Sequence, residues 1–159
     1  MKEEKKLTIR EAHQAFATGL FNYTWDLLEK KDRTPEDDEM MINTAHSSLY
    51  HWSKIGQQIN LQRGEWMVSH VYIILSRSEP ALYHAKICLD LTEKNDIGDF
   101  DKAFALEGYA RALALNERKE ESEKYYKLAK EAGQEIGKKE DKDYFLKVLD
   151  EDPWFGMRL

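Results

Sequence analysis

The sequence has little of what a disulfide-bonded, β-sheet or membrane-spanning protein needs. Among its 159 residues there is one cysteine, Cys88, so an internal disulfide is excluded. Only three prolines occur, which leaves few breaks, and the three valines never form the alternating runs that are typical of strands. No apolar run approaches the roughly 20 residues that span a bilayer. We therefore expect an all-α protein that does not cross or bind a membrane.

The charge balance argues against nucleic acid as a partner. The chain has 24 Lys and Arg against 30 Asp and Glu, a formal net charge of −6. Binding to a phosphate backbone needs clustered basic residues, which this composition does not favour. The first ten residues, MKEEKKLTIR, are charged and no hydrophobic segment follows them, unlike a secretory signal. A cytoplasmic location is the default expectation, and nothing in the composition indicates a cofactor.

Caps and apolar periodicity predict seven helices in a single domain that spans residues 1–159. The first helix begins at Thr8, with Glu11 three residues on as in a capping box. Thr34 caps the second, with Pro35 in its first position. The predicted helices cover residues 8–30, 35–56, 60–76, 78–95, 101–115, 119–136 and 139–149.

Two smaller features are also interpreted structurally. Asp99 and its neighbours Asp96 and Asp101 are expected to cap the fifth helix, because the full spacing of a calcium loop is absent. Residues 1–7 and 153–159 are flexible or docking tails. The second tail contains Trp154, Phe155, Met157 and Leu159, and these apolar residues are expected either to fold back over the last helix or to dock on a second copy as a homodimer.

The predicted helices pair into three hairpins with small and large apolar residues at regular spacing. Small residues let two helix backbones approach, and large residues fill the grooves beside them. In the third hairpin these positions are Leu106, Tyr109, Ala110, Leu113, Ser122, Tyr126 and Ala129. In the second they are Glu65, Val68, Ser69, Tyr72, Ala81, Ala85 and Cys88. The first, with Phe16, Ala17, Leu20, Ala45, Leu49 and Trp52, needs a longer helix and loop.

Over residues 60–136 this pattern resembles the tetratricopeptide-repeat superfamily. It departs from the family at Ser69 and Ala110, where glycine is common, and no proline closes either hairpin. The whole chain also resembles a group of bacterial helical-repeat proteins through HW, RGEW, ALYHAKICL and GDFDKAFALEGYARA. The first resemblance implies a right-handed stack of three antiparallel hairpins with a C-terminal capping helix. It further implies a module that binds a protein or peptide and is not an enzyme.

The resemblance also implies which residues face a concave groove. They are Arg63, Trp66 and His70 on the third helix and Phe104, Glu107 and Arg111 on the fifth. Arginine offers a planar fork for a carboxylate, and tryptophan offers a stacking surface. The alternative is that Trp66 belongs to the core and that Arg63 pairs with Glu65 or another nearby acid.

A second function class remains open at this stage, a small-molecule or metal-binding protein and possibly an enzyme. It would use His46, His51, His70 and His84 together with Glu65. The competing interpretation is that these histidines act separately and bond backbone or tyrosine hydroxyl groups. No catalytic residue is predicted, because the sequence has no GxSxG, P-loop, GxGxxG or CxxC motif.

Overall fold

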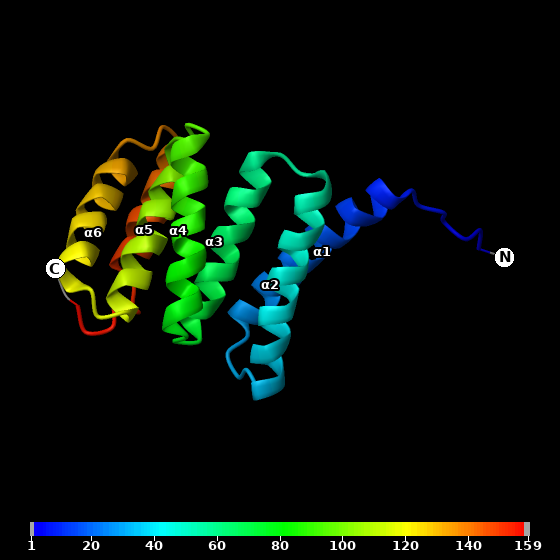
Figure 1. Cartoon of the computed structure of the whole chain (residues 1–159), viewed down its shortest axis with the longest axis horizontal. Coiled ribbons are helices and arrows are strands. Elements are labelled where there is room, and N and C mark those ends of the chain that lie inside the picture. The colour runs from blue at the N-terminus through cyan, green and yellow to red at the C-terminus, as the bar shows by residue number, and fades with distance from the viewer. Residues whose placement is uncertain (1, 158–159) are drawn as a thin grey trace.

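The computed structural model describes residues 2–157, which form seven α-helices and no strand (Figure 1). This confirms the all-α expectation. All seven predicted helices begin within two residues of the expected position. The helices are α1 (Ile9–Glu29), α2 (Pro35–Ile55), α3 (Gln58–Ile74), α4 (Ser78–Lys94), α5 (Asp99–Leu115), α6 (Lys119–Gln134) and α7 (Lys139–Asp150). Of the helices in this part of the chain, none combines the length and apolar character that crossing a bilayer requires.

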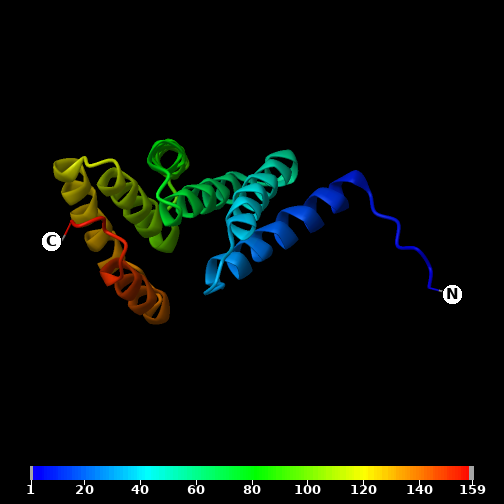
Figure 2. The ribbon, with the colours of Figure 1, turned by 90° about the horizontal axis from the view of Figure 1, so that it is seen from below.

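The first six helices lie side by side in chain order along the long axis of the molecule (Figure 1). The most extensive contacts join α1 with α2, α3 with α4 and α5 with α6, and smaller contacts join α2 with α3 and α4 with α5. α3 also contacts α5, and α7 packs on both α5 and α6. The N-terminal segment before α1 extends away from the helices (Figure 2).

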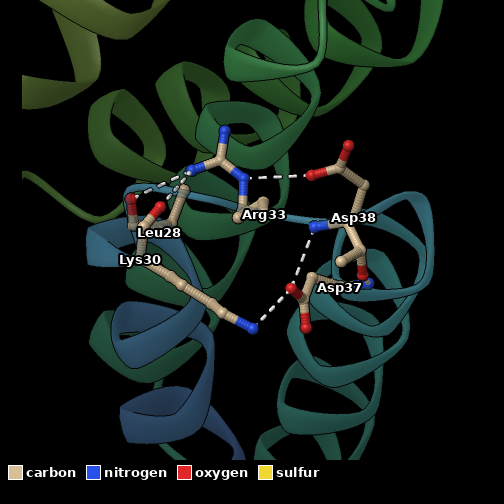
Figure 3. Close-up of polar contacts among 6 residues, drawn as sticks. Leu28, Lys30, Arg33, Asp37 and Asp38 are labelled. Carbon is tan, nitrogen blue, oxygen red and sulfur yellow. Dashed lines mark hydrogen bonds and ion pairs between the residues drawn. The ribbon is translucent and has the colours of Figure 1, made fainter.

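The first two helices begin at the capping boxes that the sequence predicts. The Thr8 hydroxyl accepts from the Glu11 backbone N–H at 3.1 Å, and the Thr34 hydroxyl accepts from that of Asp37 at the same distance. Each cap satisfies a helix N–H that has no partner within the helix. Asp37 also pairs with Lys30 at 2.6 Å, so the α1–α2 loop is tied to the start of α2 (Figure 3).

Arg33 reinforces the same loop from its other side. Its Nε donates to Asp38 at 3.0 Å, and its Nη1 donates to the Leu28 carbonyl at 3.2 Å, near the end of α1 (Figure 3). Because the last carbonyls of a helix lack intrahelical partners, an arginine here stabilises the C-terminus of α1. The angle between α1 and α2 is thus fixed by polar contacts as well as by packing.

Each of the three closest helix pairs contains a buried serine whose hydroxyl donates to an alanine carbonyl of the partner helix. The pairs are Ser48–Ala17, Ser69–Ala81 and Ser122–Ala110, with oxygen–oxygen distances of 2.7, 2.9 and 2.7 Å. All six side chains are buried. The small positions in the sequence pattern therefore lie where the helix backbones approach most closely, as expected from packing.

The apolar interior divides into two clusters that meet at α3. The smaller cluster joins α1, α2 and α3 around Met41, Met67 and Val68. The larger one extends from α3 to the C-terminal tail. Trp66 and Tyr72 pack against both clusters. α3 is therefore covered on most sides, which agrees with its nearly continuous apolar sequence.

Two sequence predictions about α1 and α5 are wrong. Asp99 does not cap α5: Gly98 is the N-cap residue, and the Asp99 carboxylate accepts from the Gly137 backbone N–H at 2.9 Å. Asp99 has a left-handed φ of 55°, which directs its side chain away from the capping geometry. Phe16, placed at a packing position of the first hairpin, is 55% exposed. α1 has a neighbour on one side only at this end of the array, so part of its apolar face stays open.

The C-terminal tail folds back onto the domain over the residues that the structure describes. Trp154 is 6% exposed and donates from its indole N–H to the Leu149 carbonyl at 3.0 Å. Met157 is also buried, and Phe155 is half-buried. The fold-back alternative is confirmed for residues 153–157, whereas Leu159 lies outside the described residues.

Candidate functional site

A groove is lined by residues of α1, α3, α5 and α7. It consists of two adjoining cavities of about 160 and 240 Å³. Their shared wall is formed by Trp25, Trp66, Phe104 and Tyr144, one residue from each of the four helices. The odd-numbered helices therefore line one continuous surface.

The first cavity has an almost continuous aromatic wall. Trp25 and Trp66 have ring centroids 5.9 Å apart, and Trp66 meets Phe104 edge-on at the same distance. Phe100 lies 4.6 Å from Phe104 and 6.5 Å from Tyr144, to which it is nearly parallel. Such pairs are typical of aromatic packing in cores and at interfaces. Here the rings remain partly open to the cavity, and Tyr144 is 51% exposed.

Arg63 stands at the edge of this cavity in a two-pronged ion pair. Its Nε and Nη2 donate to the two carboxylate oxygens of Asp101 at 3.0 and 2.9 Å. These hydrogen bonds raise the pKa of the Arg63 guanidinium above its ordinary value. The pair joins α3 to the first turn of α5, and Asp101 is the more buried partner. The planar fork that the sequence suggested for a ligand carboxylate is thus occupied by an internal acid.

Gln62 lines the same cavity and carries an unpartnered acceptor. Its side-chain nitrogen donates to the Thr92 hydroxyl at 3.0 Å and to the Asp101 carbonyl at 3.2 Å. The Thr92 hydroxyl itself donates to the Cys88 carbonyl, so it can only accept from the amide. This fixes the orientation of the amide and leaves Gln62 Oε1 buried without a hydrogen bond. Buried polar atoms without partners are rare in native proteins.

The second cavity contains a buried ion pair between Glu107 and Arg111. The two side chains are 4% and 5% exposed and are in direct hydrogen-bond contact. Burial raises the pKa of the Glu107 carboxyl, while the adjacent guanidinium opposes that shift. Removal of either partner would leave an isolated charge in the interior, which is strongly unfavourable.

Arg111 also holds the end of α7 and the tail. Its two Nη atoms donate to the backbone carbonyls of Val148, Glu151 and Pro153 at 2.7, 2.8 and 3.0 Å. Its guanidinium lies 4.2 Å from the ring centre of Trp154. The donors of Arg111 are therefore directed to structural partners, although the residue lines the groove.

His70 completes the lining beside the two tryptophans. Its ring stacks on Trp66 with centroids 4.8 Å apart and an angle of 11° between the planes. Burial, and to a smaller extent the positive charge of Arg111, lowers the pKa of His70 to about 4. The imidazole is consequently neutral at neutral pH and contributes a flat, uncharged surface to the groove.

The four-histidine metal site that the sequence left open as an alternative is not formed. His46 Nε2 lies 2.7 Å from the Tyr72 hydroxyl, and His84 Nδ1 lies 2.6 Å from Glu65 Oε2. The rings of these two histidines are neighbours, with centroids 5.3 Å apart. Burial, ahead of the nearby His84, lowers the pKa of His46.

The other two candidate histidines lie elsewhere. His51 contacts His13, with their Nδ1 atoms 2.8 Å apart, at the open end of α1 and α2. His70 is in the groove. Within residues 2–157, no group of three or more His, Cys, Asp or Glu side chains is placed to hold a metal ion. Helix positions five residues apart point in different directions, which is why His46 and His51 separate.

All six residues predicted for the groove line the two cavities. They are Arg63, Trp66, His70, Phe104, Glu107 and Arg111. The prediction missed Phe21 and Trp25 on α1, Gln62 beside Arg63, Phe100 and Asp101 on α5, and Tyr144 on α7. Phe100 lies one turn before Phe104, so helical spacing could have identified it. No such spacing indicated Tyr144, because the sequence pattern predicted the seventh helix only as the element that closes the stack of helices.

Comparison of the chain with protein-family models, with curated proteins and with solved structures finds no match in any of the three.

Proposed function

We propose that the protein is a peptide-binding helical-repeat module of the tetratricopeptide type. The three hairpins are α1–α2, α3–α4 and α5–α6, and α7 closes the array. In such an array the first helix of each hairpin lines the concave face. The lining of the groove by α1, α3 and α5 supports this arrangement.

The observation that carries the proposal is the partly open aromatic wall of the groove. Aromatic side chains are enriched at the centres of protein interfaces, because they bury a large area with few rotatable bonds. Trp25, Trp66 and Phe100 are half-buried, and Tyr144 is exposed. A partner that covers these rings removes apolar surface from water, at about 25 cal/mol per Å².

The size of the cavities favours a peptide over a compact small molecule. Pockets for drug-sized ligands hold roughly 300–1,000 Å³. The two cavities are smaller, about 160 and 240 Å³, and they adjoin along the groove. Each volume suits one large side chain, so two successive anchors of a peptide would fill them. The proposal includes no catalytic step.

The test is selection of ligands from a random twelve-residue peptide library displayed on phage, with the full chain immobilised. Synthetic copies of the selected peptides are then titrated against the protein by isothermal calorimetry. Tyr144→Ala removes an exposed ring from the groove, so it should weaken binding about three- to tenfold with little effect on folding. Tyr83→Ala, on α4 and 64% exposed, is the matched control and should bind normally.

Two results would contradict the proposal. One is a selection that yields no peptide with measurable affinity for the full chain. The other is a set of peptides that bind Tyr144→Ala and the unaltered protein equally well, since their site would then lie outside the groove.

A further inference from the structure

We infer that the groove selects a positively charged anchor, the guanidinium or ammonium group of an arginine or lysine in a basic peptide segment. The inference rests on the proposed peptide-binding function and specifies its ligand. Three independent features of the lining support it: the charge balance, the aromatic faces and an unpartnered carbonyl oxygen.

The charged side chains of the groove leave an excess of negative charge. The lining includes two arginines, Arg63 and Arg111, and four carboxylates, a formal balance of −2. The carboxylates are Asp101, Glu107, Glu151 and Asp152. Complementary charge attracts a basic partner and repels an acidic one.

Neither arginine is free to meet an acidic ligand. Arg63 donates to both carboxylate oxygens of Asp101, and Arg111 donates to Glu107 and to three backbone carbonyls. His70, the remaining basic side chain of the lining, stacks on Trp66. A peptide carboxylate would have to displace an internal acid from one of these pairs. An acidic anchor is therefore disfavoured by existing contacts as well as by overall charge.

The aromatic rings supply surfaces that bind cations. The faces of tryptophan, tyrosine and phenylalanine carry partial negative charge and attract ammonium and guanidinium groups within about 6 Å of the ring centre. Six such rings from α1, α3, α5 and α7 line the first cavity beside Asp101: Phe21, Trp25, Trp66, Phe100, Phe104 and Tyr144. A planar guanidinium can stack on such a ring while its edge N–H groups remain available to acceptors.

Gln62 adds an acceptor that has no donor. Its Oε1 is buried without a hydrogen bond, and the residue lines the first cavity. The carbonyl dipole is fixed, because the amide nitrogen is held by Thr92 and by the Asp101 backbone. An uncompensated carbonyl favours a donor-bearing cation nearby over an apolar side chain. A neutral anchor would cover the rings and leave the excess negative charge uncompensated at Asp152 and only partly compensated at Glu151, whose carboxylate lies 3.8 Å from Lys147.

The first test compares two anchors of nearly identical shape. Each library-selected peptide is resynthesised with its arginine replaced by citrulline, or with its lysine replaced by norleucine. We expect the selected peptides to contain a basic residue at a fixed position, and the neutral replacement to weaken binding about tenfold. Peptides that depend on Tyr144 but tolerate the replacement within about twofold would refute the inference and leave the proposed function standing.

The second test reverses the charge of the groove. The double variant Glu151→Lys/Asp152→Lys alters two exposed residues of the lining and changes its formal balance from −2 to +2. Glu120→Lys/Glu123→Lys makes the same change in net charge on the exposed surface of α6, outside the groove. We expect about a tenfold loss of affinity for the basic peptides in the first variant only. Equal losses in both variants, or no loss in either, would refute the inference, and thermal melting checks that both remain folded.

Discussion

At the scale of single residues, Arg111 illustrates how a side chain can line a groove and still belong to the fold. The sequence places it correctly on the groove side of α5. Besides Glu107, however, its partners are backbone carbonyls that lie 37 to 42 residues further along the chain, at the end of α7 and in the tail. Such long-range contacts leave no local pattern, so the sequence could not distinguish a ligand-binding arginine from one that closes the domain.

Substitution of Arg111 should therefore lower the free energy of unfolding, because the side chain holds the fold together as well as lining the groove. Arg111→Met leaves Glu107 as a buried charge and frees the carbonyls that end α7. We expect a loss of about 3–5 kcal/mol in the free energy of unfolding by urea. The double variant Glu107→Leu/Arg111→Met removes the isolated charge and should recover part of this loss. Equal stability of Arg111→Met and the unaltered protein would contradict the structural role.

His70 should make the protein less stable in mild acid. Its pKa in the folded state is about 4, below its ordinary value of 6.5, so the folded protein binds fewer protons than the unfolded chain between these values. The contribution of the neutral His70 to the free energy of unfolding is fully present above pH 6.5. It is lost as the pH falls towards 4, by about 2–3 kcal/mol in total. The charged groups that line the second cavity with the imidazole are Glu107, Arg111, Glu151 and Asp152.

The matched variant isolates this effect from other titrating groups. His70→Gln retains a polar side chain that does not titrate in this range. Urea unfolding at pH 7, 6, 5 and 4 should show a steeper decline for the unaltered protein than for His70→Gln. Parallel declines would mean that His70 titrates with its ordinary pKa in the folded state.

The polar pairs of the first cavity mark a second limit of sequence reasoning. Arg63 was expected either to face a ligand or to pair with Glu65 or another nearby acid. It pairs with Asp101, 38 residues away, because α3 contacts α5 directly. Glu65 instead contacts His84 across the α3–α4 pair. Helical spacing identifies the face on which a residue lies, but the partner depends on which helix covers that face.

At the scale of elements, local signals predicted the helices well. The capping boxes of Thr8 and Thr34 depend on residues three apart, and both form as expected. Asp99 failed as a cap because its carboxylate instead accepts from the Gly137 backbone N–H, a contact made only in the folded domain. The pattern of small residues succeeded because close helix approach requires small side chains wherever it occurs.

That pattern gives a direct test of packing in the first hairpin. Ala17 is fully buried, and its carbonyl accepts from Ser48 of α2, so a larger side chain there must push α1 and α2 apart. We expect Ala17→Leu to destabilise the protein by about 1–3 kcal/mol in urea unfolding. Ala15→Leu, an identical change at an exposed position of the same helix, should stay within about 0.5 kcal/mol. Similar values for the two variants would contradict the close approach.

At the scale of the whole molecule, the division of the core into two clusters suggests unequal stability along the chain. Among residues 2–157, the cluster around α1, α2 and the middle of α3 holds seven buried apolar residues, whereas the cluster from the end of α3 to the tail holds 21. Helices with few packed neighbours open most easily, and beyond their contact with each other α1 and α2 pack extensively only through α2 on α3. The α5–α6 pair has neighbours on both sides, α4 and α7.

We therefore predict that α1 and α2 unfold locally while the rest of the chain stays folded. Native-state hydrogen exchange on the full chain should give lower opening free energies for buried amides of α1 and α2 than for those of α5. Met41→Ala, which removes a fully buried side chain of the smaller cluster, should lower protection in α1 and α2 by about 2–4 kcal/mol. Because opening free energies are measured from the native state, the α5 value should fall by the same amount only where its opening includes α1 and α2. An opening confined to α5, α6 and α7 should be unchanged. Equal opening free energies for α1, α2 and α5 in the unaltered protein would instead mean that these helices unfold as one cooperative unit, with α3 coupling the two clusters through Trp66 and Tyr72.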